Sequence, residues 1–119
     1  MARKRLLECS FLIPVRRDKN LSDGGPHRST AWRWLEDRLL DFGGATRDTA
    51  LQAGWYLDPD TGERVADRSR RYVVAVPRTG LGSLRSFLRE ACTVFCQKCI
   101  YLSVAGYVEF VEGPRDEAD

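Results

Sequence analysis

A chain of 119 residues has room for one domain and one hydrophobic core, but not for two. Apolar residues make up 43% of it and charged residues 30%, which excludes wholesale disorder, and a formal net charge of +2 excludes a generic binder of polyanions. Segment 1–17 has a basic start but no small-x-small cleavage site, and no apolar run approaches the roughly 18 to 20 residues that span a bilayer. We therefore expect a cytoplasmic protein that makes no membrane contact.

The first part of the chain predicts a strand, a loop and a helix. Residues 7–15 alternate with period two, which is typical of a strand with one buried face. The polar segment 16–29, rich in Gly, predicts a long loop. Ser29 or Thr30 is expected to cap a helix, because apolar residues then recur at intervals of three and four, and Gly43–Gly44 is expected to end it.

The second part predicts a hairpin, a helix and a last strand. The segment 58–62, "DPDTG", indicates a tight turn between strands near 50–57 and 70–76, since Pro fixes one backbone dihedral and Gly tolerates a positive one. Residues 83–98 repeat apolar positions at helical intervals. Residues 100–111 predict one continuous strand, with Phe110 on its buried side and Tyr107 on its outer side.

This order of elements, β-α-β-β-α-β, predicts the fold class. We expect an α+β, ferredoxin-like sandwich in which a four-stranded antiparallel sheet carries two helices on one face. A single domain would cover residues 1–111, and the acidic segment 112–119 would be a flexible tail.

Three cysteines raise the question of a metal cluster. Cys92, Cys96 and Cys99 form a C-x3-C-x2-C pattern, the spacing with which radical-SAM enzymes hold an iron–sulfur cluster. Such a loop belongs to an α/β barrel far larger than this chain, and here the three thiols are expected along one edge of the second helix. A zinc site would need a fourth ligand from Cys9 or His27, and Cys9 is expected in the core. We therefore predict reduced, structural thiols, with no metal and no cofactor.

Arginines, a histidine and a tryptophan are the candidates for ligand binding. Residues 64–89 hold seven arginines against one acid, and guanidinium forks suit phosphate or carboxylate. His27, the sole histidine, titrates near neutrality, but no second member of a Ser/His/Asp or Cys/His set accompanies it, so the catalytic residues stay unassigned. The ligand or anion candidates are Arg16, Arg17, His27, Trp55, Arg68, Arg70 and Arg71.

The sheet face opposite the helices is expected to need a partner. Two helices cover only one side of a sheet, and the other side is too apolar to remain in water. A second copy of the chain is the simplest cover, giving a homodimer. The interface candidates are Leu12, Val73, Tyr101 and Tyr107.

The stretches "GWYLDPDTGERVADRSRRYVVAV" and "QKCIYLSVAGYVEFV" resemble small bacterial proteins of unassigned function that share a Gly-Trp hairpin and an apolar last strand. The resemblance covers most of residues 7–111 and implies the same ferredoxin-like fold, with no activity attached. Three functions stay open. The first is a non-enzymatic interaction or accessory module that self-associates through its sheet. The second is a small enzyme or ligand binder of the dimeric α/β-barrel type, and the third is an accessory protein that binds nucleic acid through its arginines.

Overall fold

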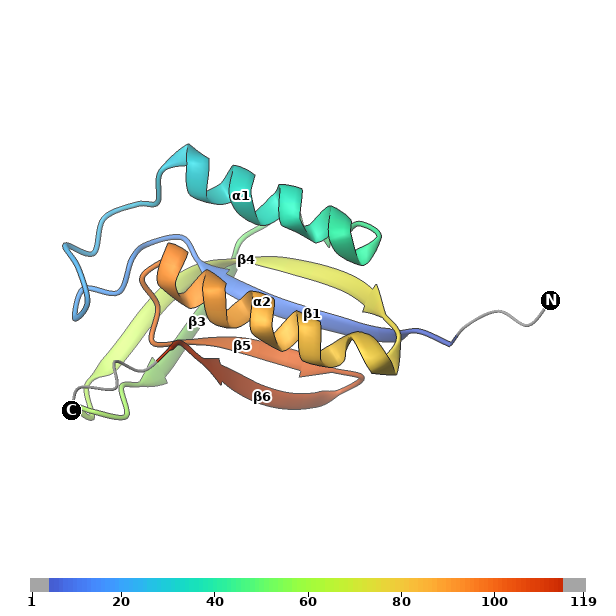
Figure 1. Cartoon of the computed structure of the whole chain (residues 1–119). Helices are drawn as coiled ribbons and strands as arrows, with labels where there is room; N and C mark the ends of the chain where they lie inside the picture. Colours follow the sequence, from blue (N-terminus) through green and yellow to red (C-terminus); the bar gives the residue numbers. More distant parts are fainter. Residues whose placement is uncertain (1–4, 115–119) are drawn as a thin grey trace, which may run out of the picture.

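The computed structural model describes residues 5–114, so the last five residues of the predicted acidic tail lie outside the described residues. Two helices lie on one face of an antiparallel sheet (Figure 1), which confirms the α+β class. Among the described residues, no helix has the length and apolar character needed to cross a bilayer. The elements are β1 (Leu7–Pro14), α1 (Ser29–Leu39), η1 (Leu40–Phe42), β2 (Thr46–Arg47), β3 (Gln52–Leu57), β4 (Arg64–Val76), η2 (Arg78–Gly80), α2 (Leu81–Val94), β5 (Cys99–Val104) and β6 (Tyr107–Glu112).

The sheet has six strands, so the prediction of four is wrong. The strand order is β2-β4-β1-β5-β6, and β3 also pairs with β4. β4 is 13 residues long and pairs with β3 along its first half and with β2 near its end. Strand β2 escapes prediction because two residues are too few to show a period. The first half of β4 escapes because "RVADRS" is polar, and a strand at an exposed position needs no apolar pattern.

The predicted last strand is a hairpin, not one strand. Ala105 and Gly106 form the turn between β5 and β6, with φ of 50° and 92°, as a two-residue turn with two positive φ values requires. The turn reverses which side chains face the helices. Phe110 pairs with Tyr101 on the face away from the helices, whereas Tyr107 pairs with Val104 on the helix side.

One hydrophobic core lies between the helices and the sheet. The alternation in β1 is confirmed, since Cys9, Phe11 and Ile13 are fully buried at 0% exposure. Phe11 stacks on Tyr72 of β4 and meets Phe87 of α2 edge-on, with ring centroids 5.4 and 6.5 Å apart. The core therefore joins the central strands to both helices through close aromatic packing.

The predicted turn is confirmed, and one helix cap and one helix end are corrected. The Asp58 amide donates to the Glu63 carbonyl at 2.8 Å, and Gly62 has a φ of 71° in the turn. Helix α1 begins at Ser29, and its N-cap is Arg28 without a side-chain hydrogen bond, so the cap predicted at Ser29 or Thr30 is one or two residues too late. Helix α2 ends at Val94, four residues before the predicted end, and Cys96 follows it with a φ of 49°.

Candidate functional site

The helices leave the opposite side of the sheet uncovered, and we call this side the outer face. The strand register places Leu12, Arg71, Tyr101 and Phe110 on it, because they pair with one another across the strands and alternate with core residues. Beyond the end of β1, the outer face continues along β3 and the first half of β4. This extension carries the polar groups that have the fewest partners.

Asp67 is the central group of this extension. Its carboxyl is half-buried and accepts no hydrogen bond from any residue of segment 5–114, and burial raises its pKa above the ordinary value of 3.8. Gly54 lies directly opposite on β3, and a Cβ there would come within 3.6 Å of the Asp67 Oδ1 atom. The absence of a side chain at position 54 thus keeps the space above the carboxyl open.

Tyr56 lies beside Asp67 on the same face. It pairs with Val65, which puts it diagonal to Asp67 across the β3–β4 pair. Its side chain is half exposed, at 50%. Burial raises the Tyr56 pKa first, and the negative charges of Asp67 and Asp18 raise it further. We call Gly54, Tyr56 and Asp67 the Tyr56–Asp67 site, with Asp18 at its border.

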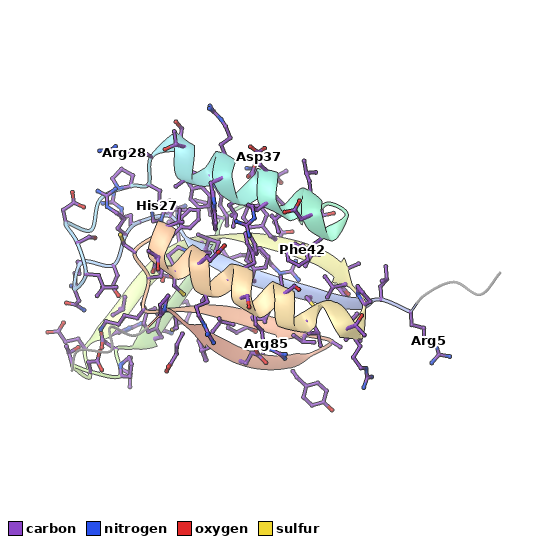
Figure 2. The ribbon with its side chains drawn as sticks, viewed as in Figure 1. Arg5, His27, Arg28, Asp37, Phe42 and Arg85 are labelled. Atoms are coloured by element: carbon purple, nitrogen blue, oxygen red, sulfur yellow. The ribbon has the colours of Figure 1, made fainter. Side chains whose placement is uncertain are left out.

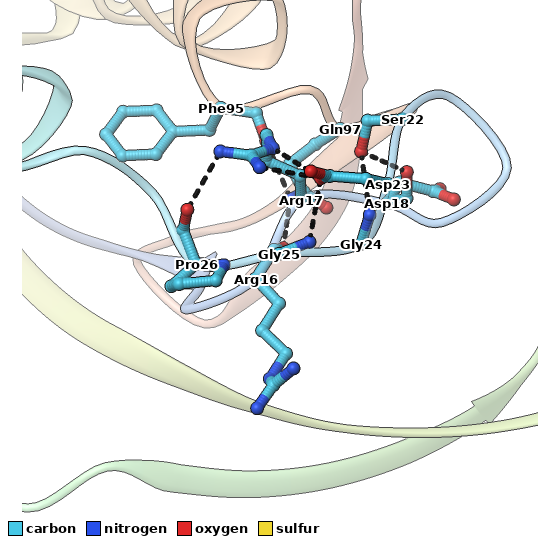
Figure 3. A network of polar contacts seen from close by, with 10 residues as sticks. All are labelled: Arg16, Arg17, Asp18, Ser22, Asp23, Gly24, Gly25, Pro26, Phe95 and Gln97. Atoms are coloured by element: carbon cyan, nitrogen blue, oxygen red, sulfur yellow. Dashed lines mark hydrogen bonds and ion pairs between the residues drawn. The ribbon is translucent and has the colours of Figure 1, made fainter.

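The long loop after β1 is rigid, and it holds Asp18 near this site. Figure 3 shows Arg17 donating to the Asp23 carboxylate at 2.6 and 3.1 Å and to the Pro26 carbonyl at 2.8 Å. The Asp18 amide donates to the Cys96 carbonyl at 2.9 Å, and the Gln97 side chain donates to the Arg16 carbonyl at 2.8 Å. The loop is therefore tied to the end of α2, and not free to move as an isolated segment.

Two neighbouring acids are already neutralised. Lys98 forms ion pairs with Asp60 at 2.7 Å and with Asp58 at 3.5 Å. The Asp58 carboxylate also accepts the Asp60 amide, and this hydrogen bond is the first cause of its lowered pKa. Asp67 forms no ion pair with a described residue, whereas the Asp18 carboxylate accepts the Asn20 amide at 2.7 Å and its charge acts on Lys98, so a cation bound at this site would find one uncompensated carboxylate, that of Asp67.

A polar strip leads from the site along β4. Asp67, Ser69 and Arg71 are alternate residues on the outer face. Ser69 is only 4% exposed, and its hydroxyl donates no hydrogen bond within segment 5–114. Across the strip, Asp48 accepts a hydrogen bond from Gln52 at 3.3 Å and forms an ion pair with Arg71 at 3.5 Å. The strip thus places an acid at one end and an arginine at the other.

His27 is a packed residue of the helix side. Its Nε2 atom lies 2.7 Å from the Pro14 carbonyl, and its ring meets Trp32 and Phe95 edge-on (Figure 2 shows its place near the start of α1). Burial lowers the His27 pKa below 6.5, which favours the neutral ring whose Nε2–H donates to that carbonyl.

The predicted arginine candidates do not converge. Arg70 lies on the helix side, 3.8 Å above the Trp32 ring, and Arg17 is used inside its loop. Arg68 is the neighbour of Asp67 in β4 and therefore faces the helix side of the sheet. Trp55 faces the same side and is 68% exposed. Arg16 is exposed at the start of the loop after β1. Of the seven ligand candidates, only Arg71 shares the outer face with Asp67.

Sequence reasoning missed Tyr56, Gly54 and Asp67. The available signal was a single acid, Asp67, within a run of seven arginines, next to a glycine in the paired strand. That pairing required the β3–β4 register, which residues 58–62 fix through their turn.

The three cysteines do not share a helix edge, contrary to the prediction. Cys92 lies in α2, Cys96 follows the helix, and Cys99 begins β5. Burial raises the Cys92 pKa to about 12, and its thiol lies 3.5 Å from the Val111 carbonyl. Within residues 5–114, no three His, Cys, Asp or Glu side chains are grouped so that they could share a metal ion.

Two solved structures are similar to nearly the whole chain. One is a phage SAM lyase in complex with S-methyl-5'-thioadenosine, with a TM-score of 0.68 and 12% identity, covering 95% of this chain and 94% of that one. The other is a phage SAM lyase in the apo state, with a TM-score of 0.63 and 13% identity, covering 98% and 100% of the two chains. No family model matches the chain, and no curated protein matches it.

These likenesses concern the fold, and they correct one expectation. The prediction of a non-enzymatic accessory module is wrong, because the similar structures belong to an enzyme. The chain has a fold that an enzyme, phage SAM lyase, also has.

Proposed function

We propose that this protein is an enzyme that binds S-adenosylmethionine (SAM) at the Tyr56–Asp67 site and cleaves it without water. The observation that carries the proposal is a half-buried Asp67 carboxyl with no partner among the described residues, next to Tyr56 on the open outer face. The similarity in fold to phage SAM lyase supplies the class of reaction.

The chemistry of SAM suits the charge of this site. SAM carries a positive sulfonium and a positive α-ammonium, and a carboxylate that lacks a counter-ion attracts either one. The Tyr56 ring adds an aromatic face, which attracts cations through its quadrupole. A bound cation would also remove the cause that raises the Asp67 pKa, because it would compensate the carboxylate that burial disfavours.

The products define the bond that breaks. S-methyl-5'-thioadenosine keeps the methyl group, the sulfur and the adenosyl group of SAM, so the bond that breaks joins sulfur to the four-carbon amino-acid arm. The electron pair of that bond goes to the sulfur, and the sulfonium becomes a neutral thioether. In a lyase reaction no water is added: either the carboxylate of the arm bonds to the carbon that leaves sulfur and closes a lactone ring, or a neighbouring carbon gives a proton to a base and its C–H electron pair forms the alkene. Asp67 and Tyr56 would bind and orient the cationic substrate for this step.

The test is to incubate the purified chain with SAM and measure S-methyl-5'-thioadenosine by liquid chromatography and mass spectrometry. The wild type is expected to form it, and Asp67→Asn is expected to lose most of the rate, about tenfold or more for one charge-assisted contact. Asp37→Asn, an exposed acid on α1, is the matched control and should keep the full rate. A wild type that neither binds SAM nor forms the thioether refutes the proposal.

The ferredoxin-like arrangement is also part of this proposal. Three strand pairings, β3 with β4, β4 with β1 and β1 with β5, support it, because the order β3-β4-β1-β5 is the one expected for a split β-α-β sheet. In this reading, β2 and β6 are additions at its two edges. The single domain is expected to run over the same four strands, and the cytoplasm remains the expected compartment.

Self-association through the outer face is the proposed partner interaction. Apolar side chains gather there at the β5–β6 end, where Phe110 is 63% exposed and meets Tyr101 edge-on at 5.8 Å. Light scattering should give a mass above that of one chain, and Phe110→Ser should reduce it, whereas Leu40→Ser, an equally exposed change on the helix side, should not. A monomer at high concentration contradicts this. The proposed interface residues are Leu12, Val73, Tyr101, Val108 and Phe110, with Tyr107 at the turn.

A further inference from the structure

We propose that Arg71 recognises the carboxylate of the substrate's amino-acid arm and so determines that the arm must be an α-amino acid. This inference rests on the proposed function. It concerns the Arg71 end of the polar strip, opposite the Asp67 end.

Arg71 faces the same side of the sheet as Asp67. Leu12 pairs with Arg71 on the outer face, and Gly54 pairs with Asp67, four residues earlier in β4. Side chains four residues apart on one strand point the same way and are separated by about 13 Å at their Cα atoms. An extended arginine side chain covers much of that distance, which leaves room for a small molecule between the guanidinium and the Asp67 carboxyl.

The Arg71 guanidinium is less occupied than those of Arg85 and Arg47, which also form ion pairs. It lies 3.5 Å from the Asp48 carboxylate and donates no hydrogen bond to any residue of segment 5–114. By contrast, Arg85 donates to Glu109 at 2.6 Å and Arg47 donates to Glu36 at 2.8 Å. Because a guanidinium has five N–H donors arranged as a fork, Arg71 keeps a bidentate edge available for a carboxylate.

The groups between the two charges fit a zwitterion. Ser69 lies between Asp67 and Arg71 and brings a hydroxyl without a hydrogen-bond partner among the described residues. Asp48 holds Arg71 on the strand side and is itself held by Gln52, so the guanidinium is positioned before a ligand arrives. A molecule with a cation at one end and a carboxylate at the other matches this order: the cation at Asp67, and the carboxylate at Arg71.

Arg68, another arginine of β4, does not offer this match to a zwitterion. Arg68 and Arg70 lie two residues apart on β4, so both face the helix side of the sheet. Arg68 is exposed and forms no ion pair with a described residue, whereas Arg71 is partly buried and pairs with Asp48, and the two face opposite sides of the sheet. Arg68 is therefore the control for the loss of one positive charge from β4.

The experiment is a calorimetric titration of the full chain with two ligands, SAM and its decarboxylated analogue, which keeps the sulfonium and the amine but lacks the carboxylate. The wild type is expected to bind SAM at least tenfold more tightly than the analogue. Arg71→Ala is expected to weaken SAM binding by about tenfold or more, to leave binding of the analogue within about twofold, and so to abolish the preference. Arg68→Ala should keep the wild-type preference.

Each outcome separates this inference from the proposed function. If the wild type binds SAM but Arg71→Ala weakens both ligands equally, or neither, Arg71 does not read the carboxylate and only this inference fails. If the wild type binds neither ligand, the proposed function fails and this inference fails with it. Arg71→Lys covers the case in which the alanine variant does not fold: it keeps the charge but not the fork, and a partial loss of the preference is expected. The wild-type preference itself needs no variant, and equal affinity for the two ligands would overturn the inference directly.

Discussion

Replacing Asp67 by Asn is expected to stabilise the fold and to weaken ligand binding at the same time. Asp67 is half-buried, and burial raises its pKa because the charged form loses solvent without gaining a partner among the described residues. At neutral pH the folded chain therefore holds an unfavourable charge that the unfolded chain can hydrate freely. An amide of the same shape removes that charge.

The magnitude follows from the partial burial. Leaving a fully buried polar group without a partner costs about 1–3 kcal/mol, so a half-buried one is worth roughly 0.5–1.5 kcal/mol. For a chain of about this length, that corresponds to a rise in melting temperature of roughly 2–6 °C. The stability that Asp67→Asn gains over the wild type depends on pH. Because the folded pKa is above 3.8, the penalty is fully present above the folded pKa and disappears as the pH falls below 3.8.

Thermal unfolding of the wild type, Asp67→Asn and Asp37→Asn across pH 3 to 8 would measure this. We expect the Asp67→Asn advantage to be largest at neutral pH and to vanish in acid, and Asp37→Asn to behave as the wild type. Adding SAM should raise the melting temperature of the wild type more than that of Asp67→Asn. An Asp67→Asn chain less stable than the wild type at pH 7 would mean that the carboxylate has a structural partner, and the reasoning above would be wrong.

Three further predictions concern Gly54, His27 and Ala105. Gly54→Ala places a methyl 3.6 Å from the Asp67 Oδ1, so calorimetry should show weaker SAM binding, by about threefold to tenfold, with an unchanged melting temperature. His27 has a lowered pKa, so its contribution to stability is present above pH 6.5 and lost as the pH falls below it. The wild type should lose stability there in denaturant titrations, and His27→Gln should flatten that dependence. Ala105→Asn relieves a positive φ of 50° in the turn and should add about 1 kcal/mol to the free energy of unfolding.

Much of the fold could be predicted because burial leaves a regular pattern. The alternation of Cys9, Phe11 and Ile13 with polar neighbours defines a one-sided strand, and the structure buries all three. The turn at 58–62 could be predicted because Pro fixes its own φ and Gly62 adopts the positive φ that the turn needs. These signals are local, and each is set by a few neighbouring residues.

The β5–β6 turn could not be read in this way. Its first residue is Ala105, which rarely adopts a positive φ, so the usual Asn-Gly or Asp-Gly signal is missing. Without the turn, one strand was expected, and every residue after it was placed on the wrong face. That single error moved Val108 and Phe110 into the expected core and Tyr107 onto the outer face.

The Tyr56–Asp67 site could not be predicted from composition. Arginines are abundant in 64–89 and suggest an anion site, yet three of the seven, Arg70, Arg71 and Arg85, form ion pairs with acids of the chain. The distinguishing property of Asp67 is a missing partner, which depends on Gly54 standing opposite it. A missing contact has no signature in sequence, because it arises from the pairing of two strands.

The length of β4 explains why a binding site can exist on this sheet. β1 is 8 residues long and β4 is 13, so β4 continues past the end of its neighbour, and β3 pairs with the part that remains. Side chains there are outside the aromatic core, and a carboxyl such as that of Asp67 can be half-buried without displacing apolar packing. A mutation that replaced it with an apolar residue would be favoured by stability alone. The cation proposed above would convert the same unfavourable charge into binding free energy, because Gly54 keeps the space beside the carboxyl open.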